Sequence, residues 1–110
     1  MGKFVKGDVV VVPFPFSDLS DSKRRPALVL TNLRGDDLIL CQITSQYLKD
    51  KYSLSIKNQS YANGNLPVEG QVRPNRIFTA DKRIILKKIA TVKDYFLEKV
   101  VEEVVSIIRT

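Results

Sequence analysis

The sequence predicts a mainly β (α+β) protein, a small β-barrel with one C-terminal helix packed on it. Short apolar runs rich in β-branched residues recur through residues 8–90, and one amphipathic pattern of helical period ends the chain. At 110 residues the chain is long enough for one compact domain and too short for two. We therefore expect a single domain over residues 1–110.

Three strands are expected in the first half of the chain. Residues 8–14 form a β-branched run, residues 26–31 form a buried apolar run, and residues 37–46 begin apolar and end polar. The polar stretch 17–25 predicts an exposed loop between the first two strands, and residues 32–36 predict a turn before the third.

The strand signals are weaker in the second half of the chain. Residues 54–56 predict a short strand, whereas residues 58–70 predict a long loop because they contain an Asn-Gly pair, a proline and a further glycine. Residues 72–80 resume an extended pattern, in which Pro74 predicts an edge strand or a bulge. One more short strand is expected at residues 84–90.

The C-terminal segment predicts an amphipathic helix over residues 95–108. Thr91 fits the N-cap of a capping box and Asp94 fits its third position. The apolar side chains form two neighbouring rows, Phe96, Val100, Val104 and Ile107 beside Leu97, Val101, Val105 and Ile108. This face covers about half of the helix circumference. Packing on the barrel explains most of that width, and the excess suggests a second burial partner such as a symmetry mate.

Basic residues are concentrated in the body of the chain. The net charge is +6 and the pI is near 9.6. Up to residue 90 there are 15 Lys and Arg against 8 Asp and Glu, whereas the last twenty residues carry 3 against 4. This excess favours a polyanionic partner such as nucleic acid, and it fits equally well a charge that only maintains solubility.

The chain has no histidine and one cysteine, Cys41. It therefore lacks the usual general acid–base group at neutral pH, and it cannot build a zinc site from His or thiolate ligands. We expect no metal and no cofactor. A lone cysteine gives no internal disulfide, no apolar run approaches the ~20 residues that span a bilayer, and the first residues show no signal-peptide pattern. A cytoplasmic protein with no membrane partner is expected.

The sharpest local feature is Lys23-Arg24-Arg25-Pro26. Proline disfavours the helical region for the residue before it, so Arg25 is held extended at the start of a strand. A guanidinium suits phosphate because its fork donates two parallel hydrogen bonds and stays charged at any working pH. Three basic residues in a polar loop can equally be a solvated charge run, and composition alone favours that interpretation.

Thr44-Ser45-Gln46 ends an otherwise apolar strand. Hydroxyl residues at such a position usually start a turn or bond to nearby backbone. The functional interpretation is a set of hydroxyls that faces a pocket, where they accept a proton or hold a phosphate oxygen. The sequence alone does not decide between the turn-forming role and the pocket-facing role of these hydroxyls.

Arg73-Pro74-Asn75-Arg76 places two guanidiniums and an amide in an extended segment. By the period of two, Arg73 and Asn75 share one face and Arg76 lies on the other. Asn75 could read a base edge, and Arg73 or Arg76 could hold a phosphate. An exposed edge strand protected by charge explains the segment equally well.

Four segments together resemble the MazF/PemK toxin family. They are Gly7-Asp8-Val9 before a β-run, Arg25-Pro26 opening the next strand, Ile43-Thr44-Ser45-Gln46 ending the third, and Val72-Arg73 followed by RIFTADKRI at 76–84. The similarity spans nearly the whole chain and keeps the order and spacing of these segments. Gly-Asp-Val alone would be weak, but the four together are fairly specific.

The resemblance implies an SH3-like β-barrel, a homodimer, and a sequence-specific, metal-independent endoribonuclease toxin that cuts single-stranded RNA and is neutralised by an acidic cognate antitoxin. The 2′-OH attack gives 2′,3′-cyclic phosphate and 5′-OH ends. The catalytic residues of the family map to Arg25 and Thr44, with Ser45 as a second candidate hydroxyl. The expected RNA-binding residues are Lys23, Arg24, Gln46, Arg73, Asn75 and Arg76. Some members have an implicated Asp where this chain has Asn75, which cannot act as a base.

Two other functions fit the same fold. A toxin similar to CcdB would bind DNA gyrase through the end of its C-terminal helix, would cut nothing, and would not need Arg25 or Thr44. A non-catalytic RNA-binding barrel would bind RNA without Thr44 and give no cleavage products. The Arg-Pro and Ile-Thr steps together favour the ribonuclease. Its recognition sequence depends on residues 47–70, whose conformation the sequence does not determine.

Overall fold

A computed structural model describes residues 4–14, 23–46, 49–67 and 69–110, without the side chains of Phe14, Lys23 and Asn32. The elements in chain order are β1 (Asp8–Phe14), β2 (Lys23–Asn32), β3 (Asp37–Thr44), β4 (Leu54–Ile56), the 3-10 turn η1 (Asn58–Ser60), β5 (Tyr61–Gly64), β6 (Gly70–Asp81), the 3-10 turn η2 (Lys82–Ile84), β7 (Lys87–Val92) and α1 (Asp94–Arg109). The predicted mainly β fold with a C-terminal helix is confirmed.

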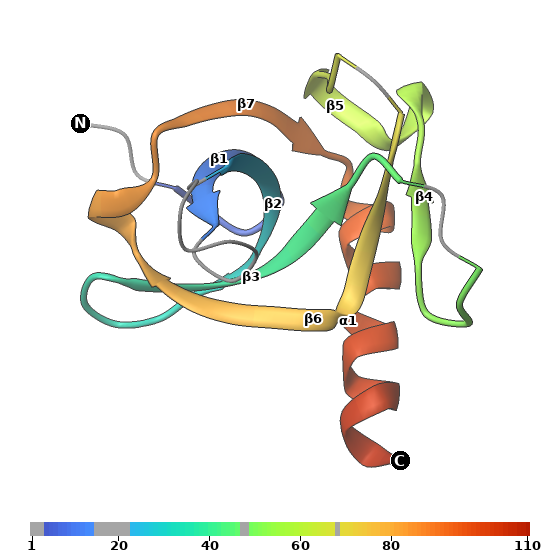
Figure 1. Ribbon diagram of the computed structural model, residues 1–110. Helices are drawn as coiled ribbons and strands as arrows, with labels where there is room; N and C mark the ends of the chain where they lie inside the picture. Colours follow the sequence, from blue (N-terminus) through green and yellow to red (C-terminus); the bar gives the residue numbers. More distant parts are fainter. Residues whose placement is uncertain (1–3, 15–22, 47–48, 68) are drawn as a thin grey trace.

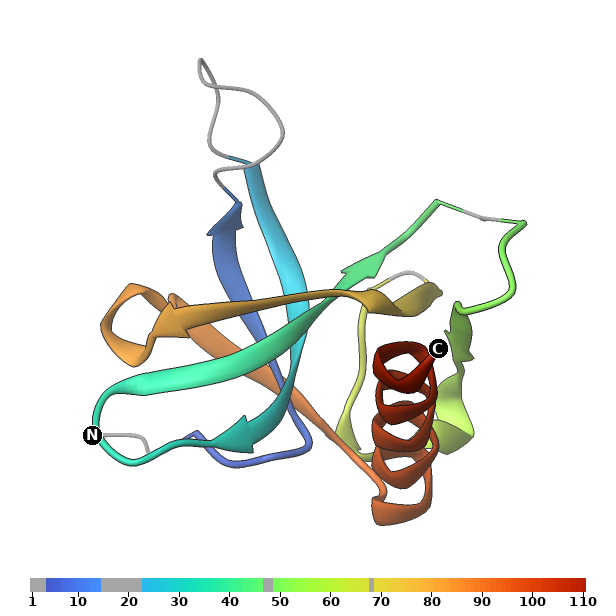
Figure 2. The same ribbon diagram turned by 90° about the horizontal axis from the view of Figure 1, so that it is seen from below.

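The strands of the described residues form one antiparallel sheet with the order β4-β6-β3-β2-β1-β7-β5. The sheet curls into a half-barrel, and α1 stands beside it on the side of β4 and β5 (Figure 1). Figure 2 looks nearly along the axis of α1 and shows the helix on one side of the crossing strands. No helix in the described part of the chain is long and apolar enough to cross a bilayer.

The central strands are buried on both faces, which explains their nearly continuous apolar runs. Successive residues of a strand point to opposite faces, so Leu28 and Val29 on β2 belong to different clusters. Leu28 packs in the cluster that contains the helix residues Phe96 and Val100, whereas Val29 packs in the cluster on the other face of the sheet. The core therefore has two layers, and β1, β2 and β3 separate them.

The single cysteine of the chain lies on the central strand β3. Cys41 is fully buried in the cluster shared with α1. Burial raises the pKa of the Cys41 thiol because the thiolate would lose its hydration. The thiol is therefore protonated and shielded from solvent at neutral pH.

The Gly7-Asp8 pair joins both neighbours of β1. Gly7 has φ of +96°, donates its N–H to the carbonyl of Val29 at 2.9 Å, and accepts the N–H of Val92 at 2.9 Å. The carboxylate of Asp8 is buried and accepts a hydrogen bond from the Thr91 hydroxyl at 3.3 Å. This segment of the family pattern is thus explained by the fold alone.

The basic cluster lies in a strand, which corrects the predicted loop over residues 17–25. β2 begins at Lys23 because the hairpin continues its pairing as far as Phe14 opposite Lys23. Residues 15–22 of the predicted loop lie outside the described residues. The next strand, β3, ends at Thr44, two residues before the end expected from the sequence.

The expected loop over residues 58–70 is also wrong. It contains η1, β5 and the first residue of β6. β5 forms by pairing with β7, Tyr61 opposite Val92, and no local apolar alternation announces this pairing. The strand expected at residues 84–90 is shifted, because η2 ends at Ile84 and β7 begins at Lys87.

β6 contains the bulge that Pro74 predicted. Its pairing with β3 jumps from Ile77 opposite Cys41 to Arg73 opposite Gln42, so residues 74–76 have no partner in β3. The alternation expected for Arg73 and Asn75 does not hold through this bulge. Nor is β6 an edge strand, because it lies between β3 and β4.

Thr91 is not the N-cap of the helix, contrary to the expectation of a capping box. Thr91 belongs to β7, where its hydroxyl is used by Asp8. The N-cap is Lys93, whose carbonyl accepts the N–H groups of Phe96 and Leu97, both at 3.1 Å. α1 therefore starts at Asp94, one residue before the predicted start.

The apolar face of α1 is only half covered. Phe96, Leu97 and Val100 are buried against the sheet, and Val104 packs at the edge of the same cluster. On the neighbouring row, Val101, Val105 and Ile108 are 37%, 41% and 69% exposed. The packing of one chain thus accounts for the first row and for Leu97, and it leaves Val101, Val105 and Ile108 of the second row at the surface.

Candidate active site

A pocket of about 440 Å³ opens where β2 begins and β3 ends, and we call it the Arg25 pocket. One wall comes from β2, with Arg24, Arg25 and Pro26, and a second from the end of β3, with Ile43, Thr44, Ser45 and Gln46. The third wall comes from the segment that leads into β6, with Leu66, Pro67, Glu69 and Gly70.

The antiparallel register brings Arg25 and Thr44 together. Ala27 pairs with Gln42, and continuing that register places Arg25 opposite Thr44. Arg25 also pairs with Val12 on β1, so strands flank it on both sides of β2. The residue is partly buried, and its Nε atom is fully so. The sheet therefore fixes the stem of this side chain at the pocket.

Thr44 both starts the turn after β3 and lines the pocket, whereas its chemical role stays a prediction. It is 8% exposed, and its Oγ1 accepts the N–H of Gln46 at 3.2 Å, which starts the turn after β3. The same residue lines the Arg25 pocket. Ser45 and Gln46 are exposed beside it. The pocket thus carries one hydroxyl that a backbone N–H holds, at Thr44, and one at an exposed residue, Ser45.

The wall opposite Thr44 depends on Gly70. A Cβ atom at this position would lie 3.1 Å from Ile43 Cγ2 and 3.2 Å from the Thr44 carbonyl oxygen. β6 therefore starts in close contact with the end of β3, and only glycine allows this approach without displacement of the neighbours. Sequence reasoning missed Glu69 and Gly70, and an isolated glycine before an extended run was the only local signal.

The structure brings five of the nine residues predicted for the site into one pocket. These are Arg24, Arg25, Thr44, Ser45 and Gln46. Arg73, Asn75 and Arg76 do not line it, and the latter two are exposed on the bulge of β6. The side chain of Lys23 lies outside the described residues. The roles of all nine residues in RNA binding or catalysis stay predictions.

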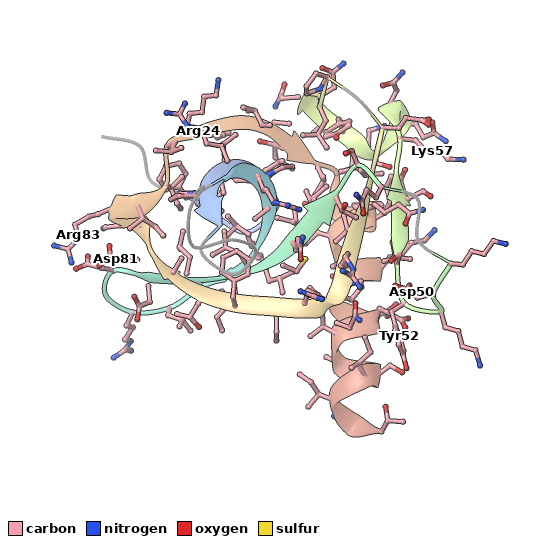
Figure 3. All side chains as sticks on the ribbon, in the orientation of Figure 1. Arg24, Asp50, Tyr52, Lys57, Asp81 and Arg83 are labelled. Carbon is pink, nitrogen blue, oxygen red and sulfur yellow. The ribbon has the colours of Figure 1, made fainter. Side chains whose placement is uncertain are left out.

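Arg73 is engaged by the loop after β3. Its Nη2 lies 3.7 Å from Oδ2 of Asp50, where the Arg73 side chain is half-buried and Asp50 is at the surface. The other Asp50 oxygen accepts the backbone N–H of Ser53 at 2.7 Å and of Tyr52 at 3.0 Å (Figure 3). These hydrogen bonds lower the pKa of Asp50, and the one from Ser53 has the largest effect. Arg73 thus holds this loop against β6.

The polar groups of the Arg25 pocket suit an anionic ligand. Arg24, Arg25, Thr44 and Ser45 all line it, and guanidinium forks match the geometry of phosphate oxygens. Among the described residues no three His, Cys, Asp or Glu side chains are grouped as metal ligands. The arrangement can hold a phosphodiester and place a hydroxyl beside it.

A small curled antiparallel sheet with one C-terminal helix is the fold of MazF proteins. The chain is similar to MazF (form I) from Deinococcus radiodurans, with 22% identity, a TM-score of 0.76 and 100% of each chain covered. It is similar to a MazE–MazF complex (form III) from the same organism, with 21% identity, a TM-score of 0.77 and 96% of each chain covered. An endoribonuclease from mycobacterial species is 16% identical, with a TM-score of 0.71 over 96% of this chain and 91% of that one.

The family can be stated from the sequence match. The model of the PemK-like, MazF-like toxins of type II toxin–antitoxin systems matches residues 5–108. The chain belongs to this family, which confirms the resemblance seen in the four sequence segments. None of the curated proteins compared matches the chain.

Proposed function

We propose that this chain is a sequence-specific, metal-independent endoribonuclease that cleaves single-stranded RNA. The observation that carries the proposal is the convergence of Arg25, Thr44 and Ser45 in one pocket at the ends of two paired strands. Membership in the toxin family and the similar fold of a mycobacterial endoribonuclease support it. We also propose that it acts in the cytoplasm.

The proposed reaction needs no external nucleophile. The 2′-oxygen attacks the adjacent phosphorus, a P–O2′ bond forms, and the bond from phosphorus to the 5′-oxygen breaks. The 2′-OH loses its proton and the departing 5′-oxygen gains one, so the products are a 2′,3′-cyclic phosphate and a 5′-OH. Negative charge gathers on the phosphoryl oxygens in the transition state, where fixed cations have their largest effect.

Arg25 and the hydroxyl of Thr44 have different roles in this reaction. The fork of Arg25 holds the phosphoryl oxygens and stabilises the charge that develops on them. The hydrogen bond from the Gln46 N–H to Thr44 Oγ1 supports a role for this hydroxyl in orienting the 2′-OH for attack. An ordinary hydroxyl is a weak base, so positioning and electrostatics supply most of the rate enhancement and the turnover is modest.

Purified protein incubated in EDTA with a long single-stranded RNA is expected to give discrete fragments. The 3′ ends should carry a cyclic phosphate and the 5′ ends a free hydroxyl, because the 2′-OH is the nucleophile. End mapping by ligation and sequencing, with and without prior phosphatase or kinase treatment, measures both ends.

Intact RNA in the presence of folded protein would overturn the ribonuclease. Broken DNA after expression in cells would then identify a gyrase poison, and RNA binding without products would identify a non-catalytic barrel. Cleavage that disappears in EDTA and returns with a divalent ion would contradict the metal-independent reaction.

We propose an acidic antitoxin as the protein partner. The Arg25 pocket has Arg24 and Arg25 on one wall, so an acidic peptide can occupy the position of the RNA phosphates. The solved MazE–MazF complexes of similar fold support a partner of this class.

A homodimer is proposed from the uncovered row of α1. Val101, Val105 and Ile108 form an exposed apolar stripe next to the row that packs on the sheet. A second copy of the chain would bury this stripe by an isologous contact, in which the same surface is used twice. The broad apolar face of the helix, unexplained by one chain, is then accounted for.

Val105→Glu is expected to convert the dimer into a monomer while the helix stays folded. A carboxylate in an apolar interface loses hydration without gaining a partner, whereas in one chain the side chain is 41% exposed and tolerates charge. Sedimentation velocity measures the mass, and circular dichroism the helix. Ser106→Glu, the same charge on the exposed polar side of α1, should remain dimeric. A dimeric Val105→Glu protein would place the interface elsewhere.

A further inference from the structure

Two smaller hollows continue the Arg25 pocket toward β4 and β5. The second, of about 210 Å³, shares Ser45, Gln46, Glu69 and Gly70 with the Arg25 pocket. The third, also of about 210 Å³, shares Ile56, Lys57 and Glu69 with the second, and Leu66, Pro67 and Glu69 with the first. Glu69 lines all three, so the hollows form one groove with this carboxylate at its centre.

Both the centre and the far end of the groove are fixed by backbone contacts. Gly70, the neighbour of Glu69, pairs with Ile56 on β4 and lies against the end of β3. Lys57 donates its N–H to Ser60 Oγ at 3.2 Å, and its carbonyl accepts the Ser60 N–H at 2.8 Å. Figure 3 shows Arg24 and Lys57 well apart on opposite sides of the molecule; Arg24 lines the first hollow and Lys57 the other two. Glu69 itself is exposed, and its position in the groove is set by its neighbour Gly70.

The charges along the groove alternate in a way that separates phosphate from base. Arg24 and Arg25 line its first part and Lys57 its far part, whereas Glu69 is the only carboxylate among the described lining residues. Glu69 forms no ion pair or hydrogen bond with the described residues. A carboxylate repels a phosphate placed beside it, so the group that best matches this position is a nucleobase with N–H donors.

We infer that Glu69 is a specificity-determining residue that reads one base next to the cleaved bond, an inference that rests on the proposed ribonuclease. An ionised carboxylate only accepts hydrogen bonds, and it pairs with the amino groups of cytosine, adenine or guanine. Uracil has a single N–H donor on this edge, at N3, and it lies between two carbonyl oxygens that a carboxylate repels, so uracil is disfavoured. Unpaired bases of single-stranded RNA expose this edge to the protein.

Cleavage of an RNA library with a randomised central segment tests this role. In the wild type, one position within two nucleotides of the cut should exclude uracil by a factor of about 5 to 100. Glu69→Gln keeps the size of the side chain and adds a donor, so uracil is accepted there and preferences at the other positions are unchanged. Glu102→Gln, the same change on the exposed side of α1, should keep the wild-type profile.

Binding of the same library in a Thr44→Val background separates this inference from the proposed function. Because this background cleaves slowly, sequencing of the pool bound after a short incubation reports the base preference of binding apart from that of cleavage. If no protein cleaves RNA but Glu69→Gln removes the preference from the bound pool, the ribonuclease fails and the role of Glu69 stands. An unchanged base profile in Glu69→Gln overturns the role of Glu69, and so does a uniform gain in affinity for all sequences, which would mean simple repulsion of phosphate.

Discussion

Arg25→Ala is expected to reduce RNA cleavage by at least about 10³-fold, because the loss of a single neutral donor to a developing oxyanion already costs about 10²–10³. Arg25 supplies a charged fork that its neighbours on two strands hold in place. Arg25→Lys keeps the charge and loses the bidentate geometry, so its cleavage rate should fall between the rates of the wild type and Arg25→Ala. Single-turnover cleavage of a short RNA, with enzyme in excess, measures this effect apart from product release.

The matched control for this change is Arg83→Ala. Arg83 is 76% exposed, pairs with Asp81 at 2.6 Å, and lies at the end of the barrel away from α1 (Figure 3). Loss of an exposed ion pair changes stability little, and this position does not line the groove. Arg83→Ala should therefore cleave at the wild-type rate. A rate for Arg25→Ala within tenfold of wild type, in a folded protein, would remove Arg25 from the catalytic machinery.

Thr44→Val is expected to lower the cleavage rate by about 10- to 100-fold, since an isosteric side chain keeps the packing and removes the hydroxyl that orients the 2′-OH. The change also removes the hydrogen bond from the Gln46 N–H, which contributes about 0.5–1.5 kcal/mol to folding. Urea unfolding measures that loss, and single-turnover kinetics measures the rate.

Thr79→Val and Ser45→Ala complete this test. Thr79 is exposed on β6, so the same substitution there should change neither the rate nor the free energy of unfolding by much. Ser45 is the neighbouring hydroxyl in the Arg25 pocket. If Ser45→Ala loses the activity and Thr44→Val keeps it, the orienting hydroxyl belongs to Ser45 and our assignment is wrong.

The parts of the fold that local physics dictates were predictable from the sequence. β1 has the expected bounds because its β-branched residues favour an extended chain wherever they are packed. Pro74 announced the bulge in β6 because proline cannot donate to the ladder. The elements that depend on distant partners were not predictable. β5 contains an Asn-Gly pair that signals a turn, and it is a strand only because β7 lies beside it.

The candidate site divides in the same way. Arg25 and Thr44 were predicted because each belongs to a short motif of the family pattern at the end of a strand. The hairpin register places them opposite each other, and their catalytic roles stay predictions. Glu69 was not found because it reaches the pocket through the pairing of β6 with β3, a contact between segments far apart in sequence. Thr91 shows the reverse error, in which a sound local motif is overridden because a buried carboxylate binds the same hydroxyl.

The burial of Cys41 has a practical consequence for studying the molecule in solution. The thiol is fully buried on an inner strand and its thiolate is disfavoured, so maleimides and other electrophiles reach it only when the sheet opens. Because the chain has one cysteine, a second cysteine introduced at an exposed position such as Ser106 would take a fluorophore or spin label alone. Distance measurements therefore do not require the replacement of Cys41. Its reaction with a thiol reagent would report global unfolding.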